Sequence, residues 1–330
     1  MKLPELKNLF RSEAFDRVFP FLFSDEDIEM WFNEAIVEAC VRKQLIRENS
    51  SIHFTQYDFR QGARIYPRDQ RMTEIVYASL LYKGQNGMIP WQLGITTAAV
   101  MDDFSYAWRT IPHRPAAIIV YDNHIEPNCN PNAEYTIHCE GYRLPKWNIS
   151  DTVTAEVLSA GTLEIIGGAG AFSTVTVDGI DILGSTVSYN TSLAQTASDI
   201  ATQINANQNR YAASSVGAII TITDTPDTGR MHNGKLIGAT ITGTIAYTVS
   251  PMAGGIDGTV DEPEINAMHH RFLTKWVLHR AYERPDTETM DKDKSAKSLA
   301  EFEAYFGTRP DAELRKMANA STPHRNLAYS

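Results

Sequence analysis

"SDEDIEMWFNEAIVEACVRKQLIRE", residues 24–48, is the most regular stretch of the chain and decides the fold predicted for it. Ser24 is a typical helix N-cap, because its hydroxyl can accept a hydrogen bond from a free backbone N–H. Three acidic residues follow, where they stabilise the positive end of the helix dipole. Apolar residues then recur three and four positions apart, at Ile28, Trp31, Phe32, Ala35, Ile36, Ala39 and Leu45 or Ile46. The pattern predicts a long amphipathic helix over residues 25–47.

Two later stretches repeat this helical pattern near the end of the chain. Residues 260–284, "VDEPEINAMHHRFLTKWVLHRAYER", carry Pro263 and acidic residues at their start, which is typical of a helix N-terminus. Residues 295–307, "SAKSLAEFEAYFG", predict another helix that ends at its glycine. Residues 310–321 predict a short helix, and residues 96–109 a weaker one.

Strands are expected mainly in residues 115–145, "PAAIIVYDNHIEPNCNPNAEYTIHCEGYRLP", which predict two or three strands joined by turns. The expected fold class of the outer segments is therefore α+β, with a helical-bundle core and a small β-sheet part. Large apolar residues on the helical faces are expected to pack that core. They are Trp31, Phe32, Ile36, Phe272, Trp276, Phe302 and Phe306.

The composition changes sharply inside the chain. Residues 151–258 hold 14 of the 20 glycines, 17 threonines and none of the five tryptophans. Asp178-Gly179 is a typical hairpin turn between alternating strands, and residues 191–207 have helical spacing. This predicts an inserted β-rich α+β domain. The expected organisation is a core in two parts, 1–150 and 259–320, around an insert at 151–258, with an extended tail at 321–330.

The charge of the 330-residue chain limits its partners. Its formal net charge is −10, which argues against gripping nucleic acid through a basic surface. An acidic surface still suits a channel that lets DNA pass without specific binding, because like charges repel. No apolar run reaches the roughly 20 residues that span a bilayer, and the N-terminus lacks a signal-peptide pattern. We therefore expect a protein made in a cytoplasm, with no membrane partner. A disulfide between Cys129 and Cys139 is not expected in that reducing compartment.

The most tempting chemical motif is the histidine set in residues 268–283, "MHHRFLTKWVLHRAYE". On a helix, His269 and His279 share a face but lie about 15 Å apart, too far for one metal ion, while His270 points elsewhere. The spacing of a zinc protease, two histidines at i and i+4, is absent. The histidines are expected to lie at the rim of the apolar face or at a subunit contact. A metallohydrolase using all three is kept as an alternative.

No other motif indicates catalysis or a cofactor. The glycine-rich residues 164–172 lack a phosphate-loop pattern, and the acidic residues 285–294 lack the order of a calcium loop. Asp102 and Asp103 are neighbours, so on a helix their carboxylates point about 100° apart. We expect no cofactor, no metal and no enzymatic activity.

With these elements in place, the chain resembles the head-to-tail adaptor, or connector, proteins of tailed bacteriophages. The resemblance covers roughly residues 20–150 and 258–320. Its markers are the acid-Pro-Glu-Ile element at residues 262–265, the "WVLHRAY" and "FEAYFG" helices, and the strand that ends in "YRLP". The insert, with "VTVDGIDILG" and "TASDIATQIN", looks like a module found in phage structural proteins.

The resemblance implies a structural protein of the virion neck. Adaptors form a ring, commonly of twelve copies, that binds the portal protein, continues the DNA channel and meets a tail nozzle or tail-tube protein. The C-terminal extension of such proteins often enters the portal. The residues expected to bind the portal here are Pro323, His324, Arg325, Asn326, Leu327 and Tyr329. The insert can dock tail fibres or brace neighbouring subunits. The alternative function is a tail or fibre-docking protein whose insert recognises a tail component or glycan.

Overall fold

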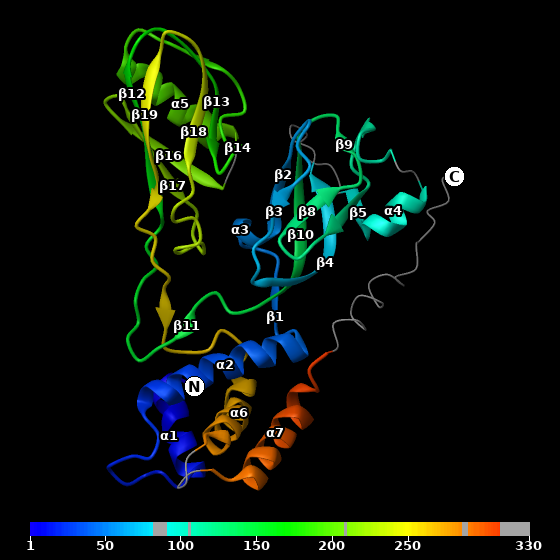
Figure 1. Ribbon diagram of the computed structural model, residues 1–330, viewed down its shortest axis with the longest axis vertical. Coiled ribbons are helices and arrows are strands. Elements are labelled where there is room, and N and C mark those ends of the chain that lie inside the picture. The colour runs from blue at the N-terminus through cyan, green and yellow to red at the C-terminus, as the bar shows by residue number, and fades with distance from the viewer. Residues whose placement is uncertain (82–90, 105–106, 208–209, 286–289, 311–330) are drawn as a thin grey trace. The chain divides into compact units, whose positions relative to one another are not determined.

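The computed structural model describes residues 1–81, 91–104, 107–207, 210–285 and 290–310. The chain divides into two compact units, which are described separately (Figure 1). The first joins Met1–Asp151 to Val260–Ser330, and the second is Thr152–Thr259. No helix in the described part of the chain combines the length and the apolar character needed to cross a membrane.

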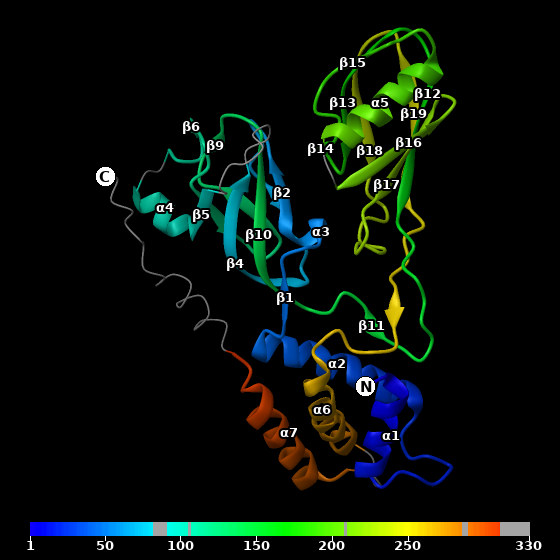
Figure 2. The same ribbon diagram turned by 180° about the vertical axis from the view of Figure 1, so that it is seen from behind.

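Both ends of the chain build the helical part of the first unit (Figures 1 and 2). Helices α2 and α6 each contact the other three helices of this part. Their apolar faces share one core, which also receives Ile149 and Ile265. The elements are α1 (Leu3–Glu13), α2 (Asp25–Lys43), the 3₁₀ turn η1 (Ala267–His269), α6 (His270–Glu283) and α7 (Lys292–Phe306).

The N-terminus of α2 lies at the predicted residue, but its C-terminus does not. The Ser24 hydroxyl accepts a hydrogen bond from the Asp27 N–H at 3.1 Å, as an N-cap does. The helix ends at Lys43, because Gln44 adopts a left-handed backbone conformation with φ of 52°. The prediction of helix to residue 47 was wrong, since Ile46–Glu48 forms strand β1.

The expected fold class, a helical-bundle core with a small β-sheet part, was also wrong. The structure is 30% helical and 34% strand, and the first unit contains a large curled mixed sheet of eight strands, a half-barrel. The strand order is β1-β10-β4-β5-β7-β8-β3, and β2 also pairs with β10. The strands are β1, β2 (Gln56–Phe59), β3 (Tyr66–Pro67), β4 (Met72–Leu81), β5 (Trp91–Thr96), β7 (Ala117–Val120), β8 (His124–Pro127) and β10 (Tyr135–Arg143).

The physical reason for this error is the irregular burial along the sheet. The ten residues of β4 do not alternate between buried and exposed positions, so they lack the period of two that identifies a strand. Two register shifts between β10 and β4 disturb the alternation further. At one of them, a Cβ on Gly141 would lie 1.9 Å from the Glu74 carbonyl oxygen, so the close strand approach requires glycine.

Shorter elements complete the first unit. Within the range of the predicted helix at 96–109, the described residues form the shorter helix α4 (Ala98–Phe104). Cys129 and Cys139 are both buried. The remaining elements are α3 (Ile52–Thr55), β6 (Pro112–His113), β9 (Asn130–Pro131) and β11 (Asn148–Ile149).

The second unit has its own apolar core between two four-stranded sheets and one helix. Asp178 and Gly179 both have positive φ, as a two-residue hairpin turn requires, and they connect β13 to β14. Helix α5 buries Ala197, Ile200 and Ile204 against the sheets. The elements are β12 (Ala160–Gly167), β13 (Gly170–Val177), β14 (Ile180–Asp181), β15 (Val187–Ser188), α5 (Leu193–Asn207), β16 (Tyr211–Val216), β17 (Ile219–Asp224), β18 (Ile237–Gly243) and β19 (Ala246–Ala253). Strand β20 (Thr259–Val260), where the chain returns to the first unit, pairs with β11.

Candidate functional site

A buried ion cluster joins the half-barrel to the segment that precedes α6. Arg143, at the end of β10, donates to Glu48 of β1 at 2.8 Å and binds both carboxylate oxygens of Glu264. Only 4% of the Arg143 side chain and 5% of the Glu48 side chain are exposed. Because three chain segments far apart in sequence meet here, the cluster ties the two parts of the first unit together.

The electrostatics of this cluster favour its charged form. Burial raises the pKa of the Glu48 carboxyl, but hydrogen bonds from two backbone amides and from Arg143 outweigh burial and lower the pKa to about 2. Burial lowers the pKa of Arg143, but the hydrogen bond and the charge of Glu264 raise it overall. The three groups therefore stay ionised at neutral pH, and none is poised to exchange a proton.

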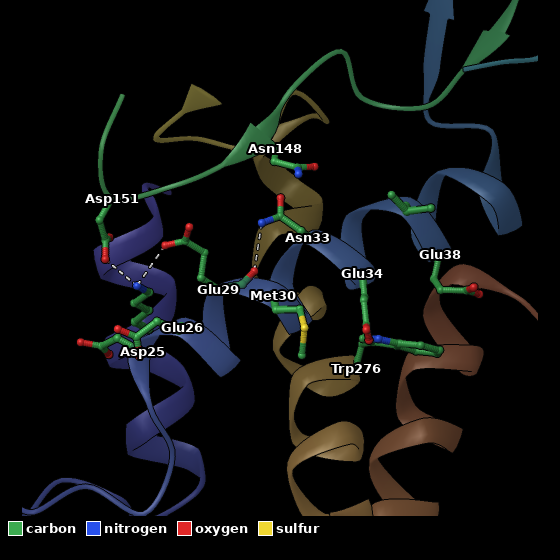
Figure 3. Close-up of a pocket in the computed structure, with 12 residues that line it drawn as sticks. Asp25, Glu26, Glu29, Met30, Asn33, Glu34, Glu38, Asn148, Asp151 and Trp276 are labelled. Carbon is green, nitrogen blue, oxygen red and sulfur yellow. Dashed lines mark hydrogen bonds and ion pairs between the residues drawn. The ribbon is translucent and has the colours of Figure 1, made fainter. Parts of the chain in front are cut away.

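A groove runs along the exposed face of α2 and encloses about 670 Å³ (Figure 3). Met30, Val37 and Trp276 supply its apolar surface, and carboxylates surround them. We call this feature the acidic groove. Its lining residues are Lys7, Asp25, Glu26, Glu29, Met30, Asn33, Glu34, Val37, Glu38, Asn148, Asp151 and Trp276.

Most carboxylates of the acidic groove are held by cations of the same chain. Lys7 lies 2.5 Å from Asp151 and 3.4 Å from Glu29, as the dashed lines in Figure 3 mark. Arg280 pairs with Glu34. Glu26 is exposed and makes no ion pair with any residue that the structure describes. The groove therefore keeps an excess of negative charge that can attract a cation from outside.

The loop between α1 and α2 exposes an unusual amount of apolar surface. We call residues 15–22 the aromatic loop. Phe15 is 90% exposed and Phe19 is 82% exposed. The full set of exposed large apolar residues in the loop is Phe15, Val18, Phe19, Phe21 and Leu22. Contiguous exposed apolar residues of this kind mark sites of contact with another molecule.

The base of the aromatic loop is rigid. Arg11 of α1 pairs with the buried Asp16 at 2.6 Å and donates to the Phe23 carbonyl at 3.1 Å. Asp16 in turn accepts from the Leu22 N–H at 2.8 Å. Since these bonds join both ends of the loop, they hold its base in place and leave its apolar tip in solvent.

The predicted core residues occupy the helical part. Trp31, Phe32 and Ile36 of α2 are buried, as are Phe302 and Phe306 of α7. The other two predicted residues, Phe272 and Trp276, are partly buried. Phe272 stacks on Tyr305 with ring centroids 3.6 Å apart, and Trp276 lies 5.2 Å from Phe302.

The three histidines have separate partners. His269 Nδ1 lies 3.1 Å from the Tyr305 hydroxyl, and His279 Nδ1 lies 2.8 Å from the Ser295 hydroxyl. His270 is buried, with Nε2 at 2.8 Å from the Ile265 carbonyl oxygen. In the described residues, no group of three or more His, Cys, Asp or Glu side chains could hold a metal ion.

Sequence reasoning missed a cluster of chemically capable residues in the insert. The Ser159 hydroxyl and His232 Nδ1 both bond Asp224 Oδ2, at 3.1 and 2.6 Å. A nucleophilic triad needs the histidine between the serine and the aspartate, whereas here the aspartate lies between the other two. The cluster therefore fastens the turn that contains His232 to β17.

Sequence reasoning also missed the acidic groove and the aromatic loop. A usable signal existed for the groove, because Glu26, Glu29, Asn33, Glu34 and Val37 follow helical spacing on α2. The predicted portal-binding residues Pro323, His324, Arg325, Asn326, Leu327 and Tyr329 lie outside the described residues.

No protein-family model matches the chain, and no curated protein matches it by sequence. The helical part presents two exposed surfaces, the acidic groove and the aromatic loop. Both suit contact between macromolecules.

Proposed function

We propose that this protein is a head-to-tail adaptor of a tailed bacteriophage, a non-enzymatic structural protein of the virion neck. Copies of the chain form a ring beneath the portal, and the ring continues the DNA channel toward the tail nozzle or tail tube. DNA passes through the ring without specific binding. The ring has twelve copies, as is common in the family that the sequence resembles.

One observation carries the proposal: the residues that carry the resemblance pack against one another although they are far apart in sequence. Glu264 of the acid-Pro-Glu-Ile element binds Arg143, which belongs to the "YRLP" strand. Trp276 of "WVLHRAY" contacts Phe302 of "FEAYFG". Residues that form one physical structure in this way support a shared architecture better than isolated short motifs do.

The charge of the protein suits a channel. The net charge of −10 prevents capture of phosphate groups, so DNA can slide through an acidic lumen with little friction. The C-terminal residues 321–330 are proposed to extend into the portal, where an extended segment can add to a sheet edge or lie in a groove.

The test is to express the full chain together with the portal protein of the same phage and to image the complex by electron cryomicroscopy. The expected result is a closed ring of this protein bound to the portal. Removal of residues 321–330 should abolish portal binding and leave the helical part folded. Portal particles that carry no ring, together with monomers in mature virions, would contradict the adaptor proposal.

A second candidate function, docking of a tail fibre, tail component or glycan, concerns the insert. The observation that favours it is structural independence: Thr152–Thr259 forms a compact unit with its own apolar core. The points where the chain leaves and re-enters the first unit are adjacent, because the Ser150 N–H donates to the Val260 carbonyl at 2.8 Å. The insert can therefore be replaced by a short connection.

The experiment replaces residues 152–259 by a short glycine linker. If head–tail joining continues and fibre attachment fails, the insert is a docking device on an adaptor. If joining itself fails while the shortened chain is folded, the insert takes part in the joint.

A further inference from the structure

We propose that the aromatic loop of one copy inserts into the acidic groove of the next copy, and that this contact builds the ring. The inference rests on the proposed adaptor function and names the contact between its subunits. The observations that carry it are the exposed apolar tip of the loop, the apolar floor of the groove and the opposite charges of the two.

The loop supplies an apolar plug. Phe15, Val18 and Phe19 lie almost fully in solvent, whereas the residues that anchor the loop are buried. Within one chain, the loop extends between the C-terminus of α1 and the N-terminus of α2 (Figure 1), and none of its residues lines the groove. A partner that covers the loop removes this aromatic surface from water, which is the main driving force for association.

The groove supplies a receptor of matching character. Met30 is 49% exposed, and it lies between Glu29 on one side and Glu34 and Trp276 on the other (Figure 3). Its surface combines an apolar centre with a polar rim, which is the usual arrangement of a protein–protein contact. The volume of about 670 Å³ leaves room for side chains of the loop.

Charge selects the partner. The exposed tip of the loop carries a single charged residue, Arg17, whose guanidinium bonds the Ser12 hydroxyl and makes no ion pair within the described part of the chain. The groove presents Glu26, which likewise has no ion-pair partner among the described residues. A loop with one cation therefore complements a groove with an excess of anions. A phosphate-bearing surface would instead be repelled by the same carboxylates, which argues against an anionic membrane as the partner of this face.

The geometry of the contact gives assembly a direction. Loop and groove are different surfaces of one chain, so each copy offers one of each to its two neighbours. Such a heterologous contact repeats from copy to copy and closes into a ring where the rotation permits. Two loops that met each other would give a symmetric dimer instead.

Cross-linking between copies tests the contact directly. One full-length protein carries Val18→Cys in the loop, and a second carries Met30→Cys in the groove. The native thiols are buried, so a short bismaleimide reacts mainly with the introduced cysteines. The matched control for the loop is Val216→Cys in the insert, because Val18 and Val216 are equally exposed, at 80%.

The expected result is a cross-linked dimer when the Val18→Cys and Met30→Cys proteins are mixed, and no dimer from either alone. The double variant should form a ladder of higher species. A mixture that cross-links no better than the pair of Val216→Cys and Met30→Cys would overturn the proposal. A dimer from Val18→Cys alone would also overturn it, since that product shows loop-to-loop pairing.

Charge reversal provides a second, independent readout of assembly by sedimentation. Arg17→Glu and Glu26→Arg should each weaken self-association about tenfold or more, and the two changes together should restore it. Combining Arg17→Glu with Glu164→Arg, an exposed acid of the insert, should not restore it. Equal association of all these variants would contradict the contact.

Failure of this inference differs from failure of the adaptor proposal. Rings on the portal without the cross-link between positions 18 and 30 would overturn the loop-to-groove contact and leave the adaptor proposal standing. Cross-linked chains that never join a portal would support the contact and contradict the adaptor function.

Discussion

Replacing Arg143 by methionine should destabilise the first unit by about 3–5 kcal/mol, because the change leaves a buried carboxylate without its cation. Glu48 is almost fully buried and receives a 2.8 Å bond from Arg143, so water cannot replace the lost guanidinium. The control is Arg47→Met on β1, the strand that carries Glu48. Arg47 pairs with Glu140 but is 59% exposed, so its loss should cost at most about 1 kcal/mol.

The assay follows unfolding in urea by tryptophan fluorescence. All five tryptophans lie outside residues 151–258, so the signal reports on the first unit without interference from the insert. A double-mutant cycle with Glu48→Gln then isolates the coupling between the two side chains. If Arg143→Met costs no more than Arg47→Met, the reasoning that the cluster joins the two parts of the unit is wrong.

Three further outcomes are expected. Folding lowers the pKa of Glu48 from 4.5 to about 2, so ionised Glu48 contributes about 3 kcal/mol to the free energy of unfolding above pH 4.5, and this contribution is lost as the pH falls toward 2. Glu48→Gln should therefore flatten the fall in stability over that range, measured by urea unfolding at each pH. Burial raises the pKa of Cys40 to about 12 and that of Cys129 to about 11, so a thiol reagent at pH 8 should leave both unmodified in the native protein and label them in urea; rapid native labelling would contradict their burial. Gly141→Ala should lower the free energy of unfolding by about 1–3 kcal/mol, because the added Cβ would meet a backbone oxygen of β4. Gly167→Ala should change it by no more than about 0.5 kcal/mol in thermal unfolding, because a Cβ there meets no atom within 4 Å.

Helices α2, α6 and α7 were predictable from the sequence because their signals are local, but α6 begins at His270 and the predicted start near Pro263 was wrong. The Ser24 cap and the apolar spacing of α2 depend on residues within a few turns of one another. The end of α2 was missed because Leu45 and Ile46 continue the apolar spacing, while Gln44 turns the backbone. Spacing alone does not reveal one left-handed residue in a position that glycine usually occupies.

The half-barrel was not predictable in the same way, because its pairings are long-range. Strand β1 at residues 46–48 pairs with the end of β10 at residues 141–143, and no local pattern encodes that contact. The acidic groove was predictable only in part. The acids on α2 follow helical spacing, but Trp276 and Asp151 come from distant segments, so only the folded chain brings the surface together.

The adjacent ends of the first unit have an evolutionary consequence. Since the chain leaves at Asp151 and returns at Val260 beside its point of departure, the span to be closed after loss of the intervening module is already short. Recombination can therefore delete, acquire or exchange that module without a compensating change in the rest of the gene. Substitutions on the surface of the module and substitutions in the packing of the surrounding segments can therefore accumulate independently within one reading frame.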